Sequence, residues 1–236
     1  MTPAEVSEMI RNKADGTSVL TVYHQEADQP EEITVTLSDV ELPTVSYEML
    51  EDSIGYLRIT EFSLMTPTQF EAAFKDLKEK QMEKLIVDLR DNPGGVLSSV
   101  CDVLRQILPE GLIVYTEDKY GNRTEETSNG KDPLEIPLAV LVNENSASAA
   151  EIFAGAIKDF KAGTIIGYTS FGKGIVQTIM PLSDGSAIKL TIQRYFTPSG
   201  VNIQGTGIEP DIKVEENSET ERDDQLQKAI DTLSEE

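Results

Sequence analysis

The amino-acid sequence predicts an α/β protein with a β-rich C-terminal part, and two observations lead to this expectation. Between residues 53 and 169, short apolar segments rich in β-branched residues alternate with amphipathic segments of about a dozen residues. This alternation is typical of strands joined by right-handed helical crossovers. After Thr169 the alternation stops, and residues up to 214 are expected to form strands and turns.

Residues 1–44 have a different pattern. A short helix is expected at 2–13, where Pro3 suits the first helical position, and two strands are expected at 18–25 and 31–40. These elements are too few to bury an independent core. This part is therefore expected to be an appendage or the remaining half of a larger unit.

The α/β region begins at Val45. In its first expected helix, Phe70, Phe74 and Leu77 follow the i, i+4, i+7 spacing of a buried face. Strands are expected at 53–62, 84–90, 111–118, 138–143 and 164–169, and helices at 66–81, 96–108 and 146–160. Later strands are expected at 174–182 and 186–197, and within 207–214. Residues 120–133 are expected to be a polar loop, and the acidic segment 215–236 to end in a short helix.

Composition excludes several classes of protein. The chain has 236 residues, of which 39% are hydrophobic and 26% charged, as in folded globular proteins. Its net charge of −22 argues against a nucleic-acid partner, whose phosphates it would repel. No apolar run approaches the roughly 18 residues of a membrane span, and the first residues lack the pattern of a signal peptide.

The chain contains one histidine, His24, and one cysteine, Cys101. His24 lies in a polar segment far in sequence from any serine in a nucleophile-like setting, and Cys101 lies in an apolar helical pattern typical of a core. Catalysis by a Ser–His or Cys–His pair is therefore disfavoured. One histidine and one cysteine also supply too few ligands for a zinc site, so neither a metal nor a cofactor is expected.

Ser148 is the candidate nucleophile. It follows a buried strand and opens a helix, a place where α/β folds expose reactive groups and where free backbone N–H groups suit an oxyanion. The same position also suits a simple helix cap, for which Ser146 would serve equally and Glu151 would complete a capping box. This stretch alone favours the helix cap, because helix caps far outnumber nucleophiles.

Lys173 lies 25 positions later (173 − 148 = 25) and favours the interpretation of Ser148 as a nucleophile. It is flanked by Gly172 and Gly174, which allow its stem to be buried tightly. A lysine acts as a base only when desolvation lowers its ordinary pKa of ~10.4 toward ~7–8. If the next residues are extended, Gln177 shares a face with Lys173, and its amide oxygen can orient the amine.

Two glycine-rich turns surround these residues. The segment 167–174 almost matches a phosphate-binding loop, but Gly174 replaces the required hydroxyl residue and a strand follows instead of a helix, so nucleotide binding is disfavoured. The segment 88–95, DLRDNPGG, ends in two glycines where a plain turn needs one. Gly94 or Gly95, together with the N–H of Ala149, is expected to form an oxyanion hole.

Together these segments resemble the carboxyl-terminal processing protease family, also called tail-specific proteases. The segments that carry the resemblance are DLRDNPGG (88–95), VLVNENSASAAEI (140–152), GYTSFGKGIVQ (167–177) and LTIQRYFTPSGVNIQGTGIEPD (190–211). The resemblance covers residues 1–214 and implies a Clp-protease/crotonase-like catalytic core with a PDZ domain.

The resemblance also implies an activity and a set of site residues. Ser148 would be the nucleophile, Lys173 the base and Gln177 the partner of the lysine, while Gly94 or Gly95 and Ala149 would form the oxyanion hole. The substrate would be a protein or peptide cut near its C-terminal tail, with no metal or cofactor, and a homo-oligomer is possible. An extracytoplasmic or membrane-anchored location is implied for the full-length parent.

The beginning of the chain departs from the family pattern. Residues 1–44 resemble only the second half of a PDZ domain, residues 45–214 the catalytic core, and residues 215–236 an additional acidic segment. The strand that would pair with a substrate tail is therefore expected to be missing. A catalytically silent peptide-binding or scaffold protein remains the alternative, and a crotonase-like acyl-CoA enzyme is disfavoured by the acidic charge.

Overall fold

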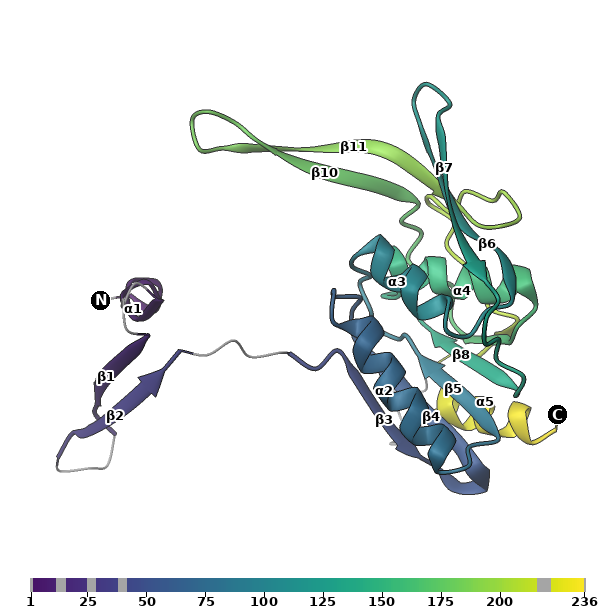
Figure 1. Ribbon diagram of the computed structural model, residues 1–236, viewed down its shortest axis with the longest axis horizontal. Coiled ribbons are helices and arrows are strands. Elements are labelled where there is room, and N and C mark those ends of the chain that lie inside the picture. Colours follow the sequence, from purple (N-terminus) through teal and green to yellow (C-terminus); the bar gives the residue numbers. More distant parts are fainter. Residues whose placement is uncertain (1, 12–15, 25–28, 38–41, 216–221, 236) are drawn as a thin grey trace. The chain divides into compact units, whose positions relative to one another are not determined.

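The computed structural model describes residues 2–11, 16–24, 29–37, 42–215 and 222–235 of the chain. The chain divides into two compact units, Met1–Leu42 and Pro43–Glu236 (Figure 1).

The first unit contains α1 (Pro3–Arg11), β1 (Thr17–Val22) and β2 (Glu31–Thr36). The two strands pair in antiparallel register. His24 contacts a glutamate of the same unit, with 3.2 Å between its Nε2 atom and Oε2 of Glu31. The expected helix and strands are present, although their expected ends at 12–13, 25 and 38–40 lie outside the described residues. The assignment of this unit to a PDZ domain stays a prediction.

The second unit is built on a six-stranded sheet with the order β12-β9-β8-β5-β4-β3. Its strands are β3 (Val45–Met49), β4 (Ile54–Ile59), β5 (Lys84–Asp88), β8 (Leu138–Val142), β9 (Thr164–Gly167) and β12 (Ile212–Lys213). All neighbours are parallel except β3, which pairs antiparallel with β4. The edge strand β3 was not expected from the sequence, because its partly exposed residues carry no apolar run.

Helices cover both faces of this sheet (Figure 1). One face packs against α2 (Thr66–Glu79), α3 (Leu97–Leu104) and α4 (Ala149–Phe160), and the other against α5 (Asp224–Ser234). Successive residues of a strand point to opposite faces, so Val87 joins the first core and Ile86 the second. The end of the acidic segment is therefore part of the packed unit, with Ala229 and Leu233 fully buried.

A second, four-stranded antiparallel sheet has the order β10-β11-β6-β7. Its strands are β6 (Glu110–Asp118), β7 (Arg123–Asn129), β10 (Ile175–Pro181) and β11 (Ala187–Phe196). The expectation of a polar loop at 120–133 is wrong for β7, whose polar residues form a largely exposed strand. Exposure on both faces removes the apolar alternation by which a strand is recognised.

The hairpin of β10 and β11 projects from the rest of the unit (Figure 1). Val176 pairs with Gln193 while the next residue, Gln177, pairs with Thr191, so Ile192 is an extra residue in β11. Such a β-bulge bends the strand and changes the direction in which the neighbouring side chains point.

Cys101 on α3 is fully buried. Burial raises the pKa of its thiol to about 12, so the nucleophilic thiolate is scarce at neutral pH. Among the described residues, no group of three or more His, Cys, Asp and Glu side chains is arranged to hold a metal ion. No helix in the described ranges is long and apolar enough to span a membrane.

Candidate active site

Ser148 lies at the N-cap of α4, directly after the loop that follows β8. Its backbone has φ 56° and ψ −113°, a conformation that non-glycine residues rarely adopt. Backbone strain of this kind is concentrated at functional sites, where the surrounding structure holds it in place. The capping box expected for Ser148 and Glu151 is present. A helix cap normally has extended dihedral angles, however, and does not require the strain seen at Ser148.

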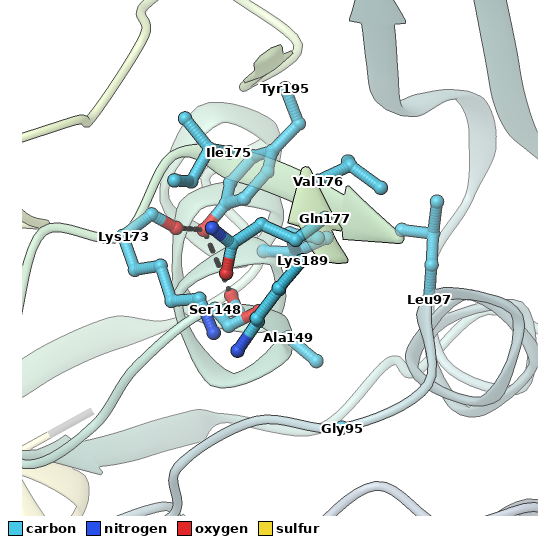
Figure 2. A pocket seen from close by; sticks show the side chains of 11 residues that line it. Gly95, Leu97, Ser148, Ala149, Lys173, Ile175, Val176, Gln177, Lys189 and Tyr195 are labelled. Atoms are coloured by element: carbon cyan, nitrogen blue, oxygen red, sulfur yellow. Dashed lines mark hydrogen bonds between the residues drawn. The ribbon is translucent and has the colours of Figure 1, made fainter. Parts of the chain in front are cut away.

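Ser148 and Lys173 line one cavity of about 360 Å³, together with Gln177, Gly95 and Ala149. The side chain of Lys173 extends toward Ser148 across this cavity (Figure 2). The structure thus brings together five of the six residues singled out in the sequence.

The sixth residue, Gly94, lies behind the cavity wall. Its N–H donates to Oδ1 of the buried Asn92 at 2.8 Å, so this amide is already engaged. A Cβ atom at Gly94 would lie 2.7 Å from the Cβ of Ser148, which explains the need for glycine. Within the described part of the chain, no hydrogen bond engages the N–H of Gly95 or Ala149. The structure therefore separates the two glycines that the sequence left equivalent.

Glu151 joins the two chain segments that carry Ser148 and Lys173. Its side chain is fully buried. Oε2 accepts the backbone N–H groups of Ser148 and Lys173, both at 2.8 Å. Oε1 accepts the N–H of Gly172 at 2.7 Å and the hydroxyl of Ser170 at 2.6 Å. The sequence predicts Glu151 only as a capping partner, because nothing local indicates a contact with residues 170–173.

Tyr195 of β11 makes a second bridge between these segments. Its hydroxyl contacts the carbonyl oxygens of Ser148, at 3.2 Å, and of Lys173 (Figure 2). Burial and the negative charge of Glu151 raise the pKa of this phenol, so it stays a protonated donor. Sequence reasoning missed Tyr195, because only the pairing of β11 with β6 places it beside α4.

An ion-pair network lies just before the turn that contains Gly94 and Gly95. The guanidinium of Arg90 donates from Nε to Oδ1 of Asp88 at 3.0 Å, and from Nη1 and Nη2 to Asp223 at 2.8 and 2.7 Å. Asp223 also caps α5 by accepting the N–H of Leu226 at 2.9 Å. Burial opposes its ionisation, but the hydrogen bonds from Arg90 hold the pKa of Asp223 below its usual range. The C-terminal helix is thus tied to the end of β5.

Replacing Asp223 with asparagine should lower the free energy of unfolding by about 1–2 kcal/mol, because the amide replaces one charged acceptor by a donor that faces Arg90. A carboxyl with a depressed folded-state pKa stabilises the protein fully above its unfolded-state pKa, so the difference should begin to shrink as the pH falls below about 4 and should be lost as the pH falls through the folded-state pKa. Denaturant unfolding at pH 7 and pH 3 measures both effects. Asp231→Asn, an exposed change on the same helix, is the matched control, and equal shifts in the two variants would contradict the role of this ion pair.

The α/β fold and the cavity that joins a strained serine to a lysine are features of a serine-type peptidase. The family comparison agrees with this class: residues 53–214 match the model of peptidase family S41. The chain belongs to this family.

Known relatives carry the names expected from the resemblance. The chain is 40% identical over 218 residues to a carboxy-terminal-processing protease of Bartonella bacilliformis, a match that covers 90% of this chain and 50% of the relative. It is 36% identical over 216 residues to a carboxyl-terminal-processing protease of Synechocystis, covering 90% of this chain and 51% of the relative. The resemblance to the carboxyl-terminal processing protease family is confirmed.

A solved structure described as a photosystem II D1 C-terminal processing protease superposes with a TM-score of 0.68 at 31% sequence identity. The match covers 91% of this chain and 60% of that structure. The expected α/β fold of the catalytic core is thereby confirmed. The chain spans about half the length of the relatives it matches.

Proposed function

We propose that this chain is the catalytic part of a serine endopeptidase that cleaves proteins near their C-terminal tails through a Ser–Lys dyad. The observation that carries the proposal is the cavity in which the side chain of Lys173 extends toward Ser148 (Figure 2). The contacts of Glu151 to both segments support a preorganised pair.

In the proposed reaction, Oγ of Ser148 attacks the scissile carbonyl carbon while the neutral amine of Lys173 takes the hydroxyl proton. When the C–N bond breaks, the lysine gives this proton to the departing amine, and an ester joins the substrate to Ser148. A water molecule then attacks the ester. The amine of Lys173 takes its proton and returns it to Oγ as the acid product leaves.

The remaining site residues receive roles that fit their contacts. The N–H groups of Gly95 and Ala149 are proposed to stabilise the oxyanion, whereas Gly94 allows the turn to approach Ser148. The amide nitrogen of Gln177 contacts the hydroxyl of Thr191 at 3.4 Å. Its amide oxygen is therefore the atom proposed to accept a hydrogen bond from Lys173.

Preference for a C-terminal tail is a proposal that rests on the relatives, whose names describe carboxyl-terminal processing. Protein substrates follow from the same names. An extracytoplasmic or membrane-anchored location and assembly into oligomers are proposals that rest on the family resemblance alone. A catalytically silent scaffold would share the fold but would not turn over any peptide bond.

Trapping the ester intermediate tests the proposal directly. The chain is mixed with an unfolded casein-like protein and, separately, with an activated peptide ester, and the quenched samples are analysed by mass spectrometry. Cleaved casein together with an acyl group on the peptide that contains Ser148 is expected. Cleavage with an acyl group elsewhere would overturn the mechanism, and absence of both products would favour the silent scaffold.

A further inference from the structure

The charge of the active-site cavity is opposite to that of the protein. The chain contains 42 acidic and 20 basic residues. Nevertheless, the residues that line the cavity include two lysines, Lys173 and Lys189, and no aspartate or glutamate. Lys173 has a role in the proposed reaction, whereas Lys189 has none.

The strand geometry directs Lys189 into the cavity. Lys189 pairs across the hairpin with Ile179, and Thr191 pairs with Gln177. Directly paired residues share a face, as do residues two positions apart, so Lys189 lies on the same face as Gln177, which also lines the cavity. In Figure 2 its side chain extends beside that of Lys173 toward Ser148.

The opposite face of the hairpin has a different character. Met180 pairs with Ile188, and Leu190 lies on the same side. These apolar side chains are substantially exposed and none of them lines the cavity, whereas Gln177 and Lys189 do, on a face that also carries the exposed Ile179. The alternation of the strand thus places Lys189 on the face that borders the cavity.

The acidic side chain that contacts the backbone of Ser148 and Lys173 is already satisfied. Glu151 lies behind the cavity wall, and its two oxygens accept four hydrogen bonds from Ser148, Ser170, Gly172 and Lys173. Among the described residues, no ion pair involves Lys189. An exposed ammonium in a cleft attracts anions, and the negative groups that an unmodified peptide offers are carboxylates.

We propose that Lys189 binds a carboxylate of the substrate beside the scissile bond and so determines which peptides are cleaved. The carboxylate comes either from an acidic side chain or from the C-terminus of a short tail. This inference rests on the proposed function, since it assigns the substrate chemistry of the same cavity. It does not depend on the residues that resemble a PDZ domain.

Matched peptides distinguish the two sources. A neutral parent peptide is compared with variants that carry glutamate in place of glutamine at successive positions around the cleavage site, and with pairs that end in a free carboxylate or an amide. We expect kcat/KM to rise about tenfold for at least one carboxylate peptide, as for a hydrogen bond to a charged group. In the Lys189→Met variant this preference should disappear, and in Lys189→Glu it should shift to peptides that carry lysine at the same position.

The Lys119→Met variant is the control, because Lys119 is an exposed residue between β6 and β7 that does not line the cavity. It should keep the preference of the unchanged chain. An unchanged ratio in Lys189→Met would overturn the carboxylate site even if every peptide is still cleaved.

Peptide binding to a Ser148→Ala background, followed by fluorescence anisotropy, separates this inference from the proposed function. A carboxylate preference that depends on Lys189 without turnover in the unchanged chain would refute the peptidase and retain the carboxylate site. Turnover without such a preference in binding or cleavage would refute the carboxylate site and retain the peptidase.

Discussion

Replacing Lys173 with methionine should reduce turnover of an unfolded protein by at least about 10³-fold while the fold stays intact. Methionine keeps an unbranched stem of similar length but cannot accept the proton of Ser148. Ser148→Ala should cause a loss of similar size, because the nucleophile itself is removed. Since the two residues act as one unit, the double variant should lose no more than the worse single variant.

Initial rates on fluorescent casein, measured with circular dichroism of the same samples, test this expectation. Lys75→Met is the matched control, because Lys75 is exposed on α2 outside the cavity, and it should retain full activity. Cleavage by the Lys173→Met variant at more than a few per cent of the original rate would exclude lysine as the base.

Replacing Glu151 with alanine should reduce both stability and turnover. Three backbone N–H groups, those of Ser148, Gly172 and Lys173, would lose a buried acceptor, as would the hydroxyl of Ser170. The free energy of unfolding should fall by roughly 3–5 kcal/mol, since each buried unsatisfied donor costs about 1–3 kcal/mol and part of this is relieved by relaxation. Turnover should fall about 100-fold, the effect of moving catalytic groups by about 1 Å.

Denaturant unfolding measures the loss of stability. Turnover at a temperature where all variants remain folded measures the loss of activity separately. The Glu151→Gln variant has nearly the same shape, but its NH₂ group would face N–H donors, so it should also be impaired. Glu48→Gln on the exposed part of β3 is the control. A Glu151→Ala variant that is destabilised yet fully active when folded would show that the carboxylate stabilises the fold without positioning the dyad.

Local signals are sufficient to predict the residues of the candidate site that lie in distinctive turns. Ser148 is recognisable from the junction of a buried strand and a helix, and Lys173 from its flanking glycines. The alternation of apolar strands and helices likewise predicted most of the large sheet. These features depend on neighbours within a few positions in the chain.

Features that depend on pairing between distant segments were not predicted. Tyr195 reaches the carbonyl of Ser148 only because β11 folds back beside α4. The choice between Gly94 and Gly95 depends on the side chain of Asn92, which takes the first N–H. The strands β3 and β7 are not predicted from the sequence, because exposed strands lack the apolar face by which a strand is recognised.

The extra residue in β11 has a consequence for how this hairpin can change during evolution. Ile192 is the extra residue opposite the step from Val176 to Gln177, so this bulge sets the direction in which the outer hairpin leaves its base. Beyond the bulge, inserting or deleting a single residue in β11 would shift the pairing by one and move Lys189 to the other face of the hairpin. Insertions and deletions between this point and the hairpin tip are therefore tolerated only in numbers that keep Lys189 on the face of Gln177, whereas the tip itself is free to vary in length.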